Sequence, residues 1–172
     1  MTERPAESEF APYYVRYVAL VPETDIIAVL EEQAEELRRL AISVPAERET
    51  HRYAEGKWSI REVFGHLVDA ERVFGYRAFC FSRGEQAALP SFDENQYVAV
   101  SRSDATPLRE LVDELALVRR SNLVVFRRLE PSEWRQSGTA SGKAVTVRAL
   151  AWILAGHARH HLTILRERYG LG

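Results

Sequence analysis

Three histidines near the end of the chain have a spacing that suits a metal ion. His157, His160 and His161 lie in a stretch whose apolar residues recur every three or four positions, which predicts a helix. His157 and His161 continue the apolar side of that helix one turn apart, so both imidazoles can reach one ion. Burying two imidazoles without partners is unfavourable. The pattern therefore indicates either metal ligands or a hydrogen-bonded pair of core histidines.

A histidine elsewhere in the chain could complete the site. His66 lies on the flank of a second helical pattern, between Val63 and Ala70, and can join the other two if the helices are neighbours. Neutral imidazoles are good ligands for zinc, nickel or copper, and three protein ligands leave a position open for water or substrate. We predict that His66, His157 and His161 hold one divalent ion. His160, off the apolar side, is interpreted as a neighbour of the ligands or an alternative ligand.

Two polar residues are candidates for a catalytic role beside such an ion. Asn122 interrupts the apolar side of a third helical pattern. It either holds a water or substrate near the ion, or is a buried polar residue that fixes the register of the helices. Asp69, three residues after His66, could orient an imidazole or act as a base; the alternative is an exposed helix carboxylate. The single cysteine, Cys80, lies in an apolar run and is expected to be a buried, unreactive thiol.

Helix signals locate the elements that must position these residues. Ser59 and Glu62 fit a capping box, Thr106 is expected to be an N-cap followed by Pro107 at the first helical position, and Thr146 is expected to cap the last helix. The predicted helices run from Pro22 and Thr24 to Pro45, from Ser59 to about Phe81, from Thr106 to about Leu129, and from Thr146 to Gly170. The long connection between the second and third helices can hold a short helical turn near Tyr97, and no strand pattern is found. We predict an all-α four-helix bundle with a crossover in that connection.

Composition limits the class of protein. The 172 residues predict a single domain, 1–172, with a lead-in at 1–23 and the bundle at about 24–170. A net charge of −2 gives no basic field for nucleic acid, and no apolar run approaches the roughly 20 residues of a membrane span. Residues 1–8 do not resemble a signal peptide, so the cytoplasm is expected. The arginine pairs 38–39, 119–120 and 127–128 are interpreted as solvated helix faces, one of which a small anionic substrate could use.

The two histidine-bearing segments resemble a known family. Residues 57–71 resemble the second-helix signature of the DinB-like proteins, and residues 145–150 and 156–161 resemble their last-helix signature. The similarity extends from about residue 16 to residue 170. It implies a four-helix bundle, often a homodimer, with a divalent metal ion, usually zinc or nickel, held at His66, His157 and His161. Relatives include thiol S-transferases that use bacillithiol, mycothiol-dependent isomerases and metal-dependent hydrolases.

Two classes of function follow from these observations. The first is a metal-dependent enzyme acting on a small-molecule substrate, with either a low-molecular-weight thiol or water as the nucleophile. The second is a non-catalytic, metal-stabilised bundle that acts in binding or stress response. A fourth protein ligand would favour the second, whereas an open position beside a cleft would favour the enzyme. A third possibility is that the histidines are core residues and bind no metal.

Overall fold

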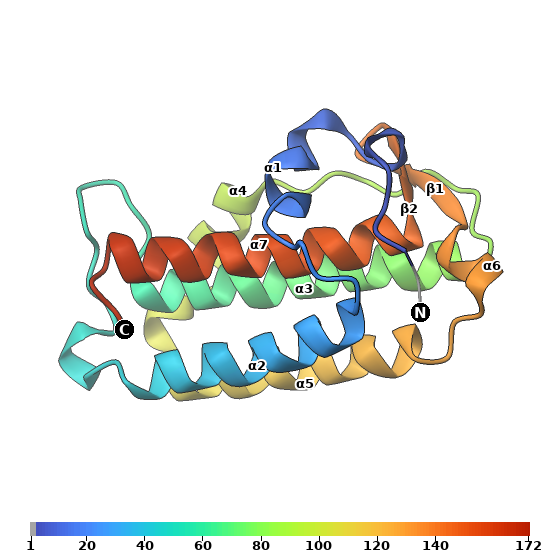
Figure 1. Ribbon diagram of the computed structural model, residues 1–172. Coiled ribbons are helices and arrows are strands. Elements are labelled where there is room, and N and C mark those ends of the chain that lie inside the picture. The colour runs from blue at the N-terminus through green and yellow to red at the C-terminus, as the bar shows by residue number, and fades with distance from the viewer. Residues whose placement is uncertain (1–2) are drawn as a thin grey trace.

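Four long helices form a closed bundle in the computed structural model, which describes residues 3–172; Met1 and Thr2 of the expected lead-in lie outside it. The helices are α2 (Ile26–Ile42), α3 (Ile60–Ser82), α5 (Leu108–Phe126) and α7 (Val147–Glu167). α3 packs between α5 and α7, and α2 packs against the same two helices from the other side (Figure 1). The predicted four-helix bundle is confirmed. Among the described residues, no helix is both long and apolar enough to cross a membrane.

The connection between α3 and α5 returns the chain along the bundle. As a result α3 and α5 run in the same direction, whereas α2 and α7 run in the opposite one (Figure 1). The connection contains the short helix α4 (Glu94–Val100), which packs on α3. The side chain of Asp93 caps α4 by accepting the backbone N–H groups of Asn95 and Gln96 at 2.9 and 3.1 Å. The predicted crossover, with a helical turn near Tyr97, is present.

Local side-chain hydrogen bonds set the start of both histidine-bearing helices. The Ser59 hydroxyl accepts the Glu62 N–H at 3.0 Å, and the Glu62 carboxylate accepts the Ser59 N–H at 2.9 Å. This is the predicted capping box. The Thr146 hydroxyl accepts the Ala149 N–H at 3.1 Å, also as predicted. These caps fix where α3 and α7 begin, and therefore which side chains face the core.

The predicted cap of α5 is wrong. Thr106 makes no capping hydrogen bond, and the helix begins at Leu108, after Pro107. A carboxylate from the loop before α3 replaces the local cap, because Glu49 accepts the Leu108 N–H at 3.1 Å. A cap supplied from 59 residues away leaves no local sequence signal.

A short hairpin includes residues 137–143, a Gly/Ser-rich stretch that the sequence predicts to be a loop. β1 (Ser137–Ala140) pairs antiparallel with β2 (Lys143–Thr146), which leads directly into α7. Ser141 and Gly142 join the strands with φ values of 53° and 71°, as a two-residue turn of type I′ requires. The expectation of no strand is wrong, because four residues are too few to show an alternating pattern. A one-turn helix, α6 (Pro131–Trp134), precedes the hairpin.

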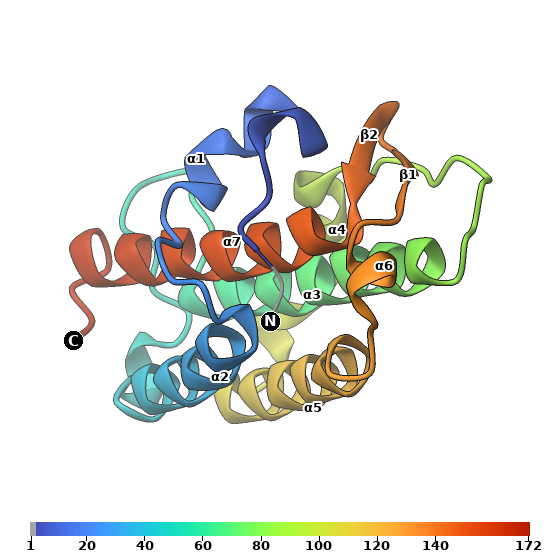
Figure 2. The ribbon, with the colours of Figure 1, turned by 45° about the vertical axis from the view of Figure 1, so that its right-hand side comes forward.

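The lead-in is folded onto the bundle. Short 3₁₀ turns at Glu7–Glu9 and Pro12–Tyr14 precede helix α1 (Val15–Val18), which lies against α7 (Figures 1 and 2). Gly156 of α7 allows the close approach, because a β-carbon there would lie 2.0 Å from the carbonyl oxygen of Tyr17. The Glu9 carboxylate also accepts two hydrogen bonds from Arg148, at 2.6 and 2.7 Å. Residues 3–23 of the lead-in therefore pack against the bundle.

A buried ion pair joins three of the long helices. Arg119 of α5, expected to be solvated, is 2% exposed and donates to both oxygens of Glu71 of α3, at 2.8 and 2.9 Å. It also donates to the carbonyl of Leu30 of α2 at 2.9 Å. The interpretation of Arg119 as solvated is wrong, because the buried side of α5 passes through Arg119, Leu123 and Phe126 in its second half.

Asn122 belongs to the same network. Its amide nitrogen donates to the side chain of Glu71 at 2.9 Å and to the carbonyl of Glu71 at 3.1 Å. A β-carbon at Gly75 would meet the Asn122 amide oxygen at 2.3 Å, so α3 and α5 are in close contact here. Of the two interpretations of Asn122, these contacts favour the one in which it fixes helix register.

We expect Arg119→Met to lower the free energy of unfolding by about 3–5 kcal/mol, because it leaves the Glu71 carboxylate buried without its partner. The double variant Glu71→Leu with Arg119→Met should recover much of that loss. Arg72→Met is the matched control, since it breaks the more exposed Arg72–Glu114 pair and should cost less than about 1 kcal/mol. Urea denaturation measures all three, and equal effects of Arg119→Met and Arg72→Met would contradict the role of the buried pair.

Candidate metal centre

Three imidazoles converge between α3 and α7. His66 comes from α3, and His157 and His161 come from adjacent turns of α7. The Nε2 atom of His157 lies 3.0 Å from Nε2 of His66 and 3.2 Å from Nε2 of His161. One potential ligand atom from each residue lies within 4.8 Å of the other two, and all three side chains are buried. The structure thus brings together the three residues predicted as ligands.

Hydrogen bonds between the rings do not account for this arrangement. A neutral imidazole has one N–H and one lone pair, so three Nε2 atoms facing one another cannot all be satisfied. The Nδ1 atoms of His66 and His161 are also buried and have no partner among the described residues. Tetrahedral zinc, with Zn–N distances of about 2.0–2.1 Å, places its ligand nitrogens about 3.3 Å apart, close to the two separations seen here. The nitrogen donor set therefore fits one divalent ion.

Burial keeps the three rings uncharged. Desolvation lowers the pKa of His66 from its ordinary value of 6.5 to about 4, and the charge of a protonated His160 would add to the shift. Desolvation, followed by the neighbouring imidazoles, also lowers the pKa values of His157 and His161 well below the ordinary range. All three are neutral at pH 7, the form in which imidazole binds a metal ion.

The three histidines form part of the wall of a cavity of about 220 Å³ between α1, α3, α4 and α7. Tyr17 packs edge-on against His157 with ring centroids 5.4 Å apart, and Trp58 lies 4.8 Å from His66. Other residues at the cavity are Tyr13, Arg16, Phe74, Phe92, Glu94 and His160. Among residues 3–172, no fourth histidine, cysteine or carboxylate joins the three nitrogens. An ion held there would have open positions toward the cavity.

His160 lies beside the three nitrogens without joining them. Its ring is half-buried, 5.2 Å from the ring of His161 and 5.4 Å from that of Tyr17. Burial, followed by the positive charge of Arg16, lowers its pKa. This placement favours the interpretation of His160 as a neighbour of the ligands.

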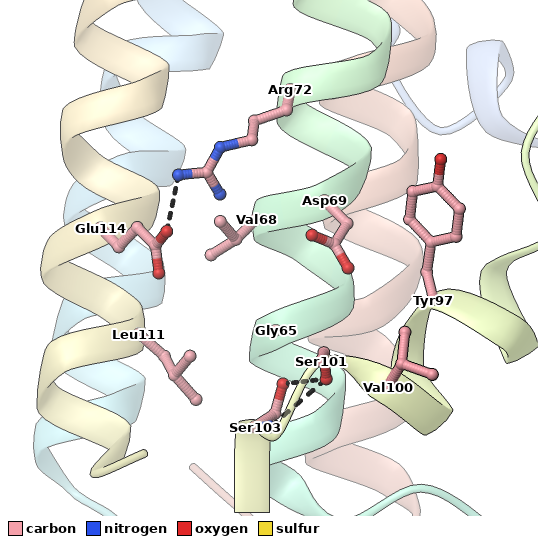
Figure 3. Close-up of a pocket in the computed structure, with 10 residues that line it drawn as sticks. All are labelled: Gly65, Val68, Asp69, Arg72, Tyr97, Val100, Ser101, Ser103, Leu111 and Glu114. Atoms are coloured by element: carbon pink, nitrogen blue, oxygen red, sulfur yellow. Dashed lines mark hydrogen bonds and ion pairs between the residues drawn. The ribbon is translucent and has the colours of Figure 1, made fainter. Parts of the chain in front are cut away.

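Asp69 faces a separate cavity of about 300 Å³, bounded by α3, α4 and α5 (Figure 3). Its carboxylate makes no hydrogen bond or ion pair with another described residue, while Arg72 above it binds Glu114 at 2.6 Å. Burial raises the pKa of Asp69. None of the histidines lines this cavity, so the geometry gives Asp69 no direct access to the three nitrogens.

The aromatic and charged walls of the histidine cavity were not predicted from the sequence. Tyr13, Arg16 and Tyr17 belong to the lead-in, and Phe92 and Glu94 to the crossover. The one sequence signal was the group Tyr13, Tyr14 and Tyr17 in the lead-in, which the sequence predicts to pack on the outside of the core. This signal does not place the tyrosines near the histidines, because that requires the contact between α1 and α7. The contact in turn depends on the absence of a β-carbon at Gly156.

The metal-free protein should lose stability as the pH falls below about 6.5. Between pH 6.5 and about 4 the unfolded chain binds a proton at His66, whereas the folded chain does not. The free energy of unfolding therefore has its full value above the pKa that His66 has in the unfolded chain, and it decreases as the pH falls toward the pKa of His66 in the folded chain. The shift at His66 corresponds to about 3 kcal/mol. Denaturation of chelator-treated protein from pH 7.5 to 4.5 measures this, and His66→Gln should make the profile less steep, because His157 and His161 still exclude protons in the folded state. His51→Gln, at an exposed position, should leave the profile unchanged, and a flat wild-type profile would contradict the burial argument.

Comparisons with known proteins agree with this architecture. The sequence model of the DinB superfamily matches residues 29–165. YfiT from Bacillus subtilis, described as a probable metal-dependent hydrolase with an unusual four-helix bundle topology, is 19% identical, with a TM-score of 0.78 over 99% of this chain and 95% of that one. A DinB-like protein from the same organism, YjoA, is 18% identical, with a TM-score of 0.58 over 83% of this chain and 87% of that one.

A larger protein shares the fold. A mycothiol-dependent maleylpyruvate isomerase is 14% identical, with a TM-score of 0.67 over 84% of this chain but only 61% of the isomerase. No curated protein matches the sequence. The DinB superfamily model includes all three convergent histidines and spans most of the chain, which therefore belongs to the DinB superfamily.

Proposed function

We propose that this protein is a metal-dependent enzyme that acts on a small-molecule substrate. The observation that carries the proposal is the convergence of three neutral imidazoles at a cavity with no fourth protein ligand among residues 3–172. A sphere closed by a fourth side chain would have supported a purely structural ion. The open side supports catalysis.

Different residues of the cavity would hold the metal ion, restrain its ligands and accept a proton. A bound divalent ion supplies Lewis acidity and lowers the pKa of a coordinated water or thiol. His66, His157 and His161 would hold the ion, and the rings of Tyr17 and Trp58 pack against two of them and limit their movement. His160, half-buried and with a lowered pKa, would offer an unprotonated ring nitrogen that can accept a proton from the nucleophile.

Two reactions fit this arrangement. Hydrolysis, with water as the nucleophile, is supported by the likeness in fold to YfiT over nearly the whole chain. Transfer of a low-molecular-weight thiol such as bacillithiol or mycothiol is the second candidate, supported by the likeness in fold to the mycothiol-dependent isomerase. Zinc or nickel suits three imidazole ligands in either reaction.

Protein purified without a nickel column should contain about one equivalent of zinc or nickel per chain, measured by elemental analysis. His157→Ala should lose that metal, because Nε2 of His157 lies within 3.2 Å of both other ligand nitrogens. His160→Ala should keep it, since His160 lies outside the three-nitrogen group. Full occupancy in His157→Ala, or metal-free wild-type protein that takes up no added ion, would contradict the ligand assignment.

The metal-loaded protein should turn over members of a panel of esters, amides and small electrophiles, assayed with and without bacillithiol or mycothiol. Chelation should abolish the activity, and added zinc or nickel should restore it. Turnover without thiol supports the hydrolase, and strict thiol dependence supports the transferase. His51→Ala is the control for loss of a histidine away from the site. A fully loaded protein that leaves the whole panel unchanged would favour the non-catalytic bundle.

A further inference from the structure

One cationic side chain at the histidine cavity has no acidic partner. Arg16 of α1 lines the cavity together with the three converging histidines. Ten other arginines form ion pairs with carboxylates, and Arg16 forms none with any residue from 3 to 172. Its one hydrogen bond to the protein runs from Nη2 to the hydroxyl of Tyr17 at 2.9 Å. Most of its N–H groups are therefore available to a ligand.

Aromatic stacking fixes the guanidinium. Its central carbon lies 4.2 Å from the ring centre of Tyr13 and 4.7 Å from that of Tyr17. Both distances are within the range of a cation–π contact. Tyr17 in turn packs against His157 and His160, so the rings that hold Arg16 also contact the histidines. The guanidinium is thus oriented before any ligand enters.

The charge of Arg16 reaches the histidine side of the cavity. Arg16 lines the same cavity as His157 and His160, and the ring of Tyr17 on which it stacks contacts both of them. Among residues 3–172, Glu94 is the only carboxylate that lines the cavity, and it forms no ion pair with Arg16. Three neutral imidazoles also leave the charge of a bound cation uncompensated. The electrostatic balance at this end of the cavity therefore favours an anionic ligand.

The remaining walls favour an apolar body on that ligand. Trp58, Phe74 and Phe92 line the cavity and offer ring surface to an apolar group. The volume of about 220 Å³ is below that of a typical drug-binding pocket, which indicates a small molecule. The planar fork of an arginine matches the two oxygens of a carboxylate.

We propose that the substrate of this site is a small organic carboxylate, with its anionic group bound by Arg16 and its apolar part packed between the aromatic walls. This assigns Arg16 as a specificity-determining residue. The substrate role rests on the proposed function, whereas carboxylate binding by Arg16 can be measured without turnover or metal.

Benzoate tests the inference by isothermal titration calorimetry, with benzamide as its uncharged analogue and inorganic phosphate as a second anion. Benzoate should bind wild-type protein more tightly than either of the other two. Arg16→Gln should weaken benzoate binding by about tenfold or more, because it removes charge-assisted hydrogen bonds, while binding of benzamide should stay the same. Arg16→Lys keeps the charge but loses the planar fork, so its affinity for benzoate should lie between those of the wild type and of Arg16→Gln.

Arg109→Gln is the matched control, because Arg109 is 90% exposed on α5 and does not line the cavity; it should bind benzoate like the wild type. Each titration is run on zinc-loaded and on chelated protein, with metal content and thermal stability measured for every variant. A protein that takes up no zinc refutes the proposed function, and the chelated samples still test Arg16. Equal benzoate affinity in folded wild-type and Arg16→Gln protein would overturn the inference, as would tighter binding of phosphate than of benzoate.

Discussion

The burial of three uncharged imidazoles between α3 and α7 is the constraint on which the rest of the structure depends. In water each ring nitrogen would be hydrogen-bonded, but inside the protein the Nε2 atoms face mainly one another, and two Nδ1 atoms have no partner among residues 3–172. Removing these polar groups from water is unfavourable unless something replaces the lost hydrogen bonds. A cation shared by the three lone pairs is the replacement that the geometry accommodates.

The fold meets this constraint through the positions of two helices. The capping box at Ser59 fixes the first residue of α3, and the hydroxyl of Thr146 fixes the first residue of α7. These two positions determine which residues of α3 and α7 face each other. The Glu71–Arg119 pair, two residues after Asp69, then ties α3 to α5, and neither residue of the pair lines the histidine cavity. The histidines are consequently held on backbone that is fixed from both sides, which is the kind of rigidity that a metal site needs.

The sequence predicted those features that depend on neighbouring residues. Helix caps and apolar periodicity located α3 and α7, and the facing sides of the two helices then identified His66, His157 and His161. The predictions were wrong where a contact joins residues that are distant in the sequence. Arg119 looks like any exposed arginine until Glu71, 48 positions away, is placed opposite it, and the cap of α5 comes from Glu49. The aromatic walls of the cavity depend in the same way on the contact between α1 and α7.

The contact between α1 and α7 affects how proteins with these three histidines can differ in the width of their cavity entrance. The carbonyl of Tyr17 stands where the β-carbon of any other residue at position 156 would be, and Tyr17 is one residue from Arg16. A single added methyl group would therefore push α1 away from α7 and widen the entrance above the histidines without replacing any of them. The choice of molecules admitted to the cavity can thus diverge through one small residue that does not line the cavity, while the three nitrogen donors are retained.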